Sequence, residues 1–424
     1  MSEQPLRIGL LTYRGNPRSG GQGVYVRHLS RELAALGHKV DVWSGQPYPE
    51  LADTVGLKRV PGMDLWKEKV DGRFRLPSPR ELRDPINLSE YTRTITGGFA
   101  EPRTFSRRVA RHFRQNGARE AYDIIHDNQC LGPGMLDLRR YLPVVATVHH
   151  PVTMDRRIAI GSTRSIVKRY GLRRWYAFLP SQIRVARRLD RILTVSEASA
   201  TDIARDYGIE RQRINVVGNG IDLDVFRPQP EVARDENRIM TTMSADSPLK
   251  GLRFLLEALA TLRKTRPRLT LTVIGEPTAG TKTRQLVGDL GLEAAVRFTG
   301  RVEAEEIVGT YARSALAVVP SLYEGFGFPA GEAMACEVAV VSTTAGALPE
   351  VVGGDGRCGL LVEPRSAPAL ARAIGLLLDD PHRRLEMGEN GRKRVESMFS
   401  WRAAAERTAG AYREVIARKE EARC

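Results

Sequence analysis

The chain has 424 residues, more than one hydrophobic core of ordinary size accommodates, so we expect two domains. Its hydrophobic content of 42% is typical of a globular protein, and no apolar run reaches the roughly 18 residues that a membrane span needs. A net charge of +15 indicates anionic partners or arginine-rich exposed faces. No nucleic-acid-binding signature accompanies this charge, so we expect no nucleic acid partner.

The cysteines are widely separated and match neither a disulfide framework nor a metal-binding spacing. They are Cys130, Cys336, Cys358 and Cys424. The first residues enter a strand directly and lack the apolar core of a signal peptide. We therefore expect a cytoplasmic protein that needs no metal and no cofactor, with attachment to the inner face of the membrane as a further option.

The chain opens with a strand, a glycine-rich loop, a helix and a second strand. The expected ranges are 7–12, 13–23, about 24–36 and 39–43. This βαβ unit resembles a Rossmann opening, although its glycines do not follow the Gly-x-Gly-x-x-Gly spacing of dinucleotide sites. Gly20 and Gly21 still allow a ligand to approach the backbone closely.

Residues 44–105 contain many prolines, so we expect an irregular segment with a functional role. Two buried strands follow, at 123–127 and 142–149, and both end in polar side chains. These side chains are His126, Asp127, Asn128, His149 and His150. Histidines at strand ends beside a ligand site are better functional candidates than histidines inside a core.

The segment 156–191 is strongly basic and has a single acid, Asp190. Trp175, Tyr176 and Phe178 stand among its arginines and lysines. A basic helix with interleaved aromatics can lie on an anionic membrane or bind an acidic ligand. A solvated basic face is the simplest interpretation.

The second half alternates strands and helices in the pattern of a doubly wound parallel sheet. After strand 191–196 and helix 197–207, we expect a strand from 214 and then strands at 238–243, 269–274, 296–299, 315–319, 338–342 and 359–362. Helices are expected at 252–263, 367–378, 381–398 and from 399 to about 419. The expected domains are therefore 1–205 and 206–398, with the last helix, 399–424, packing back on the first domain.

The stretch 321–332 has the composition of a ligand-binding turn between a strand and a helix that begins at Pro329. Its two glycines suit a loop that receives an anion at a helix N-terminus. Glu324 enters this loop, and Glu332 is expected in the first helical turn. Carboxylates beside a phosphate site suggest sugar hydroxyls as partners, whereas the plainer interpretation of Glu332 is a helix-dipole role.

Together these features resemble the retaining GT-B glycosyltransferases of glycosyltransferase family 4. The resemblance covers nearly the whole chain and is sharpest between 214 and 364. Its markers are Gly20-Gly21, Thr147-Val-His149, Val217-Gly-Asn-Gly-Ile-Asp222, Lys250-Gly251, Phe298-Thr-Gly-Arg301, Glu324-Gly-Phe-Gly-Phe-Pro329 with Glu332, and Ala345-Gly-Ala-Leu-Pro-Glu350. It implies an α/β fold of two Rossmann-like, doubly wound parallel-sheet domains that face each other across a cleft.

The resemblance also implies roles for single residues. Glu332 would accept hydrogen bonds from a ribose, and Glu324 would contact the hexose. Lys250 would neutralise the diphosphate as its charge grows, and His149 would lie beside the sugar, so Glu324, Lys250 and His149 are the expected catalytic residues. The further donor-binding positions are Gly20, Gly21, Asn219, Gly220, Ser244, Arg301, Val302, Gly325, Phe326 and Gly327. The family usually has an arginine where this chain has Ser244, so its grip on the diphosphate differs from the usual pattern.

The implied reaction is retaining transfer of a hexosyl group from a nucleoside-diphosphate sugar, with UDP as the favoured nucleoside diphosphate. The acceptor, a lipid, a glycan or a small molecule, would lie along 44–105 and 156–191. Two alternatives stay open: a sugar-nucleotide epimerase or phosphorylase on the same fold, and a non-catalytic binding protein. The combination of Glu324, Glu332 and Lys250 favours the transferase, because simple binding would not require it.

Overall fold

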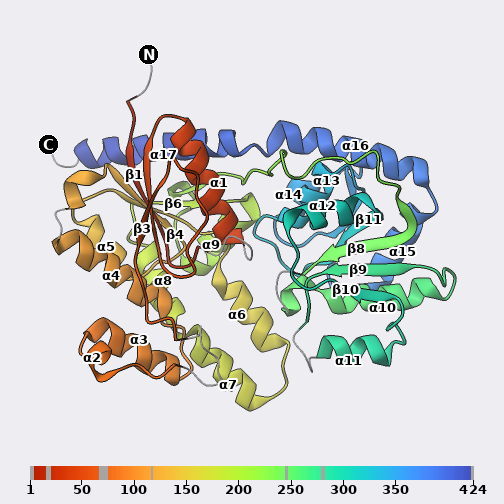
Figure 1. Cartoon of the computed structure of the whole chain (residues 1–424), viewed down its shortest axis with the longest axis horizontal. Coiled ribbons are helices and arrows are strands. Elements are labelled where there is room, and N and C mark those ends of the chain that lie inside the picture. The colour runs from red at the N-terminus through yellow and green to blue at the C-terminus, as the bar shows by residue number, and fades with distance from the viewer. Residues whose placement is uncertain are drawn as a thin grey trace. The chain divides into compact units, whose positions relative to one another are not determined.

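The computed structural model describes residues 4–15, 21–65, 75–115, 118–243, 247–277 and 282–421. The chain divides into two compact units (Figure 1). The first unit contains the chain up to 195, residues 200–217 and the residues from 402 onward, and the second contains 196–199 and 218–401.

Within the described residues, the first unit contains a seven-stranded sheet in which all neighbouring strands are parallel. Its strands are β1 (Arg7–Thr12), β2 (Lys39–Ser44), β3 (Gly56–Arg59), β4 (Ile124–Asn128), β5 (Val144–Thr147), β6 (Arg191–Thr194) and β7 (Ile214–Val216). The strand order is β3-β2-β1-β4-β5-β6-β7, so the winding direction reverses between β1 and β4. Because β7 pairs with β6, this unit continues past residue 205 to residue 217.

The helices of the first unit, with the short 3-10 turns, come from most of its length and from the end of the chain. They are α1 (Gly21–Ala35), α2 (Pro79–Leu82), α3 (Pro85–Ile95), α4 (Glu101–Gln115), η1 (Ala118–Ala121), α5 (Gly134–Arg139), α6 (Val152–Gly161), α7 (Ile166–Trp175), η2 (Tyr176–Phe178), α8 (Leu179–Ala186), α9 (Glu197–Tyr207), η3 (Arg211–Arg213) and α17 (Trp401–Glu421). On α4, Phe105, Val109 and Phe113 recur every four residues and join the core. This spacing places them on one helical face.

The expectation of an irregular segment at 44–105 is wrong, because this stretch contains β3, α2, α3 and the start of α4. Pro79 and Pro85 stand at helix starts, where the missing backbone N–H costs nothing. Ser78 and Glu81 form a reciprocal capping box on α2, and the Asp84 carboxylate caps α3 by accepting from the backbone N of Ile86 at 2.8 Å.

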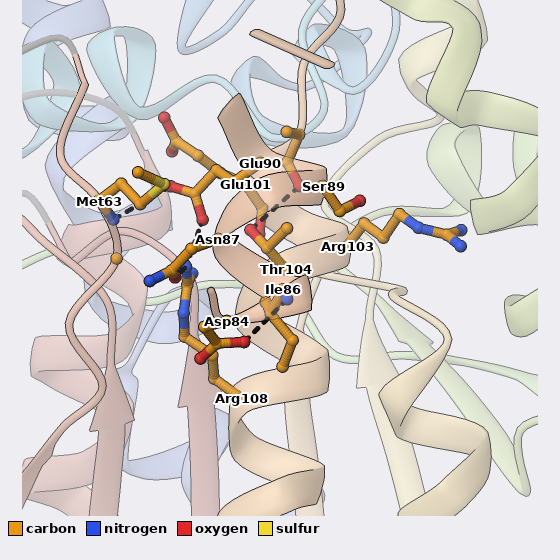
Figure 2. A network of polar contacts seen from close by, with 12 residues as sticks. Met63, Asp84, Ile86, Asn87, Ser89, Glu90, Glu101, Arg103, Thr104 and Arg108 are labelled. Atoms are coloured by element: carbon orange, nitrogen blue, oxygen red, sulfur yellow. Dashed lines mark hydrogen bonds and ion pairs between the residues drawn. The ribbon is translucent and has the colours of Figure 1, made fainter. Parts of the chain in front are cut away.

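A buried polar network joins α3 to α4 (Figure 2). The Arg108 guanidinium lies 2.6 Å from the Glu90 carboxylate, and their side chains are only 10% and 5% exposed. Arg108 also donates to the Asn87 amide oxygen at 2.6 Å, and Glu90 accepts from the backbone N of Met63 at 3.2 Å. A buried ion pair persists when such bonds satisfy its remaining polar atoms, so this network fixes α3 against α4.

In the second unit, the described residues form a six-stranded parallel sheet in the order β10-β9-β8-β11-β12-β13. Its strands are β8 (Asp235–Thr242), β9 (Thr270–Ile274), β10 (Val296–Phe298), β11 (Ser314–Val319), β12 (Val340–Thr343) and β13 (Gly359–Val362), which confirms the six strands expected from the sequence. Its helices and short turn are η4 (Pro248–Lys250), α10 (Leu252–Arg263), α11 (Lys282–Asp289), α12 (Ala304–Ala312), α13 (Phe328–Ala335), α14 (Leu348–Val352), α15 (Ala367–Leu378) and α16 (Pro381–Met398) (Figure 1). The winding reverses between β8 and β11.

Both sheets confirm the predicted α/β class with doubly wound parallel sheets. Parallel strands that are covered on two faces need near-continuous apolar runs, which is why the sequence could predict them. Every residue of β11, for example, is buried. Among the described helices, none combines the length and the apolar composition that crossing a bilayer requires.

Candidate functional site

The two strands that flank the reversal point of the second sheet deliver a cation and a carboxylate to the same place. Lys250 ends the turn that follows β8, and Glu324 lies in the loop after β11. The Lys250 ammonium lies 2.8 Å from the Glu324 carboxylate, and the Ser321 hydroxyl donates to that same oxygen at 2.7 Å. Open α/β sheets bind ligands at this point, so the topology assembles a polar site from residues 74 positions apart.

Gly251 makes the approach of Lys250 to β11 possible. Its φ is +65°, a conformation that residues with a side chain rarely adopt. A Cβ at this position would lie 1.9 Å from the carbonyl oxygen of Pro320, directly after β11. The chain therefore needs a glycine at position 251 to pack closely against the end of β11. This packing brings the neighbouring Lys250 to the same place.

The loop after β12 holds the backbone of Glu324 in place, again with a glycine that has a positive φ. The backbone N of Ala347 donates to the Glu324 carbonyl at 3.0 Å. Gly346 has a φ of +58°, and a Cβ on it would meet that carbonyl oxygen at 2.2 Å. The sequence marker at 345–350 is therefore a support for the carboxylate loop.

Glu332 lies on the same side of the second sheet but not in the first helical turn, because α13 begins at Phe328 and Glu332 is its fifth residue. Loss of water around the carboxyl raises the pKa of Glu332 to about 7, while the Tyr311 hydroxyl and Lys250 lower it and Glu324 raises it. These couplings place all three predicted donor-site charges together. Tyr311 comes from a buried position of α12 and has no sequence signature of its own.

The remaining loop residues before α13 contribute backbone rather than side chain. The Phe326 ring is buried and packs edge-on against Phe328 and Phe399, with ring centroids 5.1 and 5.5 Å apart. Gly327, with a φ of +107°, caps the start of α13, and the carbonyl of Gly325 accepts from the Ser196 hydroxyl at 2.7 Å.

The other predicted donor-binding positions differ in burial and in packing. Asn219 is 2% exposed, and among the described residues its side-chain oxygen has no hydrogen-bond partner. A Cβ on Gly220 would lie 2.3 Å from the backbone N of Trp401, so this glycine has a packing reason to be present. Arg301 and Val302 follow β10 at the carboxyl edge of the sheet, with Arg301 exposed. Gly20 and Ser244 lie outside the described residues, and Gly21 begins α1.

In the first unit, His149 follows β5 and is held by the end of β4. Its Nε2 lies 2.7 Å from the Asn128 amide oxygen, whose NH2 group faces the carbonyl of Gln22 at 3.3 Å. This orientation of the amide requires the proton of His149 on Nε2. Desolvation, with smaller effects from His150 and His126, lowers the pKa of His149 to about 3, so the ring is neutral at physiological pH.

Gln129 ties the loops after β4 and β5 together, and nothing in the sequence marked it. Its side-chain oxygen accepts from the backbone N of His149, and its NH2 group donates to the carbonyl of His150, both at 2.8 Å. The residue is 3% exposed and has a φ of +54°. A side chain that closes both bonds explains why this uncommon backbone conformation is kept.

A second hydrogen-bonded chain reaches His149 from the far end of the sequence. The Tyr412 hydroxyl of α17 lies 2.6 Å from His126 Nδ1, and His126 Nε2 lies 2.7 Å from the Thr147 hydroxyl. The Tyr25 hydroxyl lies 2.8 Å from that of Thr147, and its ring meets the His149 ring edge-on at 4.8 Å. His126 is therefore a buried structural residue, and burial lowers its pKa to about 3.

The basic segment 156–191 serves two different surfaces. On α7, the apolar side chains of Ile166, Val167 and Tyr170 are 83%, 81% and 72% exposed among the basic residues. Arg187 and Arg188, directly after α8, line a hollow of about 770 Å³. The other arginines that line it are Arg107, Arg139, Arg140 and Arg213. The elements around this hollow lead into β5, β6 and β7, so it lies at the amino ends of these strands, opposite the edge that holds His149.

Among the described residues, no group of three histidine, cysteine, aspartate or glutamate side chains is arranged to hold a metal ion. Cys130, Cys336 and Cys358 are buried free thiols, and Cys424 lies outside the described residues.

Sequence comparisons identify the family to which this pair of units belongs. Residues 19–225 match the model of Glycosyltransferase Family 4, and residues 226–394 match that of Glycosyl transferases group 1. The chain is 46% identical over 416 residues to the MMP alpha-(1->4)-mannosyltransferase of Mycolicibacterium hassiacum, covering 97% of this chain and 99% of that relative. The chain belongs to glycosyltransferase family 4. This glycosyltransferase is also 30% identical over 441 residues to the D-inositol 3-phosphate glycosyltransferase 2 of Catenulispora acidiphila, covering 97% and 96% of the two chains.

Solved structures confirm the GT-B fold of the glycosyltransferase. The sucrose-phosphate synthase of Thermosynechococcus elongatus matches with a TM-score of 0.73 and 24% identity, over 98% of this chain and 100% of that one. HepE of Anabaena, in complex with UDP and glucose, matches with a TM-score of 0.69 and 19% identity, over 96% and 99% of the two chains.

Proposed function

We propose that this glycosyltransferase moves a mannosyl group from a nucleoside-diphosphate mannose to a hydroxyl group of a saccharide acceptor, with retention at the anomeric carbon. The Lys250–Glu324 pair, held 2.8 Å apart at the reversal point of the second sheet, carries this proposal. The mannosyl group is taken from the name of the relative that is 46% identical over nearly the full length of both chains.

In the proposed reaction, Lys250 stabilises the leaving diphosphate. Its ammonium has one carboxylate partner in Glu324, and a diphosphate brings at least two negative charges to the same place. Charge on the leaving group grows as the glycosidic bond breaks, so a fixed cation favours the transition state over the ground state. Lys250 supplies this charge in the proposal without a metal ion, and full activity in excess EDTA would support that part of it.

Glu332 is the proposed ribose ligand. A carboxylate accepts hydrogen bonds from two neighbouring hydroxyls, and the half-buried position of Glu332 leaves it accessible to a ligand. The sequence favours UDP as the nucleoside diphosphate of the donor. The name of the relative specifies a mannosyl group but no nucleotide. A thermal-shift panel of UDP, GDP and ADP with their mannose, glucose and N-acetylglucosamine conjugates tests both points, because a ligand that binds the native state raises its stability.

In this panel we expect the ligands of one nucleotide, UDP, GDP or ADP, to raise the melting temperature of the wild type. We expect the same ligands to have no effect on Glu332→Ala. A rise that persists unchanged in the variant would remove the ribose role from Glu332. No rise with any conjugate, and no transfer from any of them, would overturn the proposed function.

Retention is proposed to occur by attack of the acceptor on the face from which the diphosphate departs. Nuclear magnetic resonance of the product distinguishes retention from inversion directly, because it reports the anomeric configuration. A covalent glycosyl adduct on Glu324, found by mass spectrometry after incubation with donor alone, would replace this scheme with a double displacement. Conversion of the donor into a different sugar nucleotide would instead support an epimerase, which the comparisons do not favour.

We further propose that the enzyme works in the cytoplasm and contacts an anionic membrane through α7. The exposed apolar side chains on this basic helix support the contact, because such a helix lies in the interface of anionic bilayers. Co-sedimentation with vesicles of phosphatidylglycerol tests it. We expect binding that weakens in Ile166→Glu and at high salt, and equal pelleting of wild type and variant would exclude the contact.

A further inference from the structure

Three segments of the first unit bring aromatic rings together beside the end of β1. Phe99, between α3 and α4, stacks on Trp175 at the end of α7, with ring centroids 5.1 Å apart and an interplanar angle of 25°. Tyr13 meets Phe99 edge-on at 6.0 Å, and Phe178 does so at 5.5 Å. We call Tyr13, Phe99, Trp175 and Phe178 the aromatic cluster, and each of its rings is half-buried.

The aromatic cluster lies at the ligand-binding edge of the first sheet. Tyr13 directly follows Thr12, the last residue of β1, and β1 flanks the point where the winding of this sheet reverses. Ligands of open α/β sheets bind there. Lys250, Glu324 and Glu332, the proposed donor ligands, all belong to the second unit, so the edge of the first sheet is left for the other substrate.

Polar groups suited to hydroxyls stand next to the rings. The Tyr176 ring lies 6.3 Å from that of Phe178, and desolvation, with the charge of Asp155, raises the pKa of Tyr176 to about 12. Both oxygens of Asp155 lie 3.0 Å from Nε2 of His150, which follows His149 after β5. A pyranose has a C–H face that packs against aromatic rings and hydroxyls that bond to a carboxylate. The half-buried rings of the aromatic cluster, with Asp155 nearby, offer partners for both.

The cation that lies over a ring of the aromatic cluster is already paired. The Arg14 guanidinium lies 5.7 Å from the centre of the Phe99 ring and makes two bonds to the Glu101 carboxylate, at 2.5 and 2.6 Å. The charge of Arg14 is therefore compensated by Glu101, which favours an uncharged ligand on this ring over a phosphorylated one.

We propose that the aromatic cluster, with Asp155 and His150, is the binding subsite for a neutral pyranose of the acceptor. This inference rests on the proposed function and deepens it, because it assigns the acceptor class. It separates this enzyme from its relatives named for D-inositol 3-phosphate, a charged molecule.

The experiment measures mannosyl transfer with α-(1→4)-linked mannobiose and with D-inositol 3-phosphate as acceptors, for wild type, Trp175→Ala, Trp175→Phe and Tyr141→Ala. Tyr141 is the control, because it is an exposed aromatic residue of the first unit outside the cluster. We expect the KM for mannobiose to rise about tenfold in Trp175→Ala, the loss of roughly one aromatic contact, and to recover in large part in Trp175→Phe. Donor KM, acceptor-independent donor hydrolysis and the kinetics of Tyr141→Ala are expected to match the wild type.

An unchanged KM for mannobiose in Trp175→Ala, or D-inositol 3-phosphate as the better acceptor with a KM that this variant does not alter, would overturn the inference. If Trp175→Ala does not fold, Asp155→Asn takes its place, with the same expected rise in acceptor KM. Saturation-transfer NMR with mannobiose alone separates this inference from the proposed function. Binding that Trp175→Phe weakens, without transfer from any donor, would retain the subsite and reject the reaction, and no contact in the wild type would reject the subsite.

Discussion

The carboxyl edges of the two sheets have the same topology and opposite chemistry. The edge of the second sheet carries the Lys250–Glu324 ion pair and Glu332, whose pKa both of these charges affect. The edge of the first sheet carries neutral histidines, amides, hydroxyls and aromatic rings, tied together by hydrogen bonds. One fold thus provides an edge dominated by charges, suited to a diphosphate and ribose, and an edge dominated by neutral groups, suited to a sugar ring. The side chains after the strands make the difference.

The largest effect should come from removing the cation of the second edge. In Lys250→Ala, we expect kcat to fall by about 10²–10³, because one electrostatic contact to the leaving group is lost. Steady-state kinetics measures the loss, with Lys264→Ala as the control, since Lys264 is an exposed lysine at the end of α10. Equal kcat values for Lys250→Ala and the wild type would show that the charged edge does not serve the chemistry.

The next effect concerns the backbone that delivers this lysine. Gly251→Ala is expected to destabilise the second unit by about 2–3 kcal/mol, because it combines a positive φ with a Cβ that meets a backbone carbonyl. Urea denaturation measures the change. Gly410→Ala in α17, where a Cβ meets nothing within 4 Å, should instead be neutral or slightly stabilising. A loss of stability as large in Gly410→Ala would show that the position in the second edge is not special.

A pH dependence should distinguish the charged edge from the neutral one. The pKa of Glu332 is raised in the folded state from an ordinary value of 4.5, so its contribution to stability is fully present below pH 4.5 and is lost as pH rises through about 7. Glu332→Gln removes this loss, and we expect it to exceed the wild type by about 3 kcal/mol at pH 8 and to match it near pH 4. Denaturant unfolding at the two pH values measures both, and a difference that does not vary with pH would contradict the shifted pKa.

The smallest effect is expected in the neutral edge. Tyr412→Phe removes the hydroxyl that meets His126 and leaves a buried ring nitrogen without this partner, at a cost of about 1 kcal/mol. Because this chain of bonds ends at the Tyr25 ring beside His149, kcat should also fall slightly while donor binding is unchanged. Urea unfolding and kinetics measure the two effects. A loss of donor affinity in Tyr412→Phe would mean that the two edges do not act separately.

The expected second sheet is complete in the structure, because its buried parallel strands and amphipathic helices follow local periodicity. The helices within 44–105 were missed although their capping residues, Ser78 and Asp84, are present in the sequence. There, the prolines were interpreted as turn signals, whereas Pro79 and Pro85 occupy helix starts.

The sequence by itself determined the fold class and the family, and it predicted Lys250, Glu324 and Glu332 as site residues, because all of these depend on short motifs at fixed spacing after predictable strands. Only the tertiary structure decided how the first edge is built. Gln129, Tyr25, Tyr412 and the aromatic cluster come from segments far apart in the chain, and no local pattern predicts which of them meet. Their partners are selected by the order of the strands and by packing across the sheet, which are properties of the whole fold.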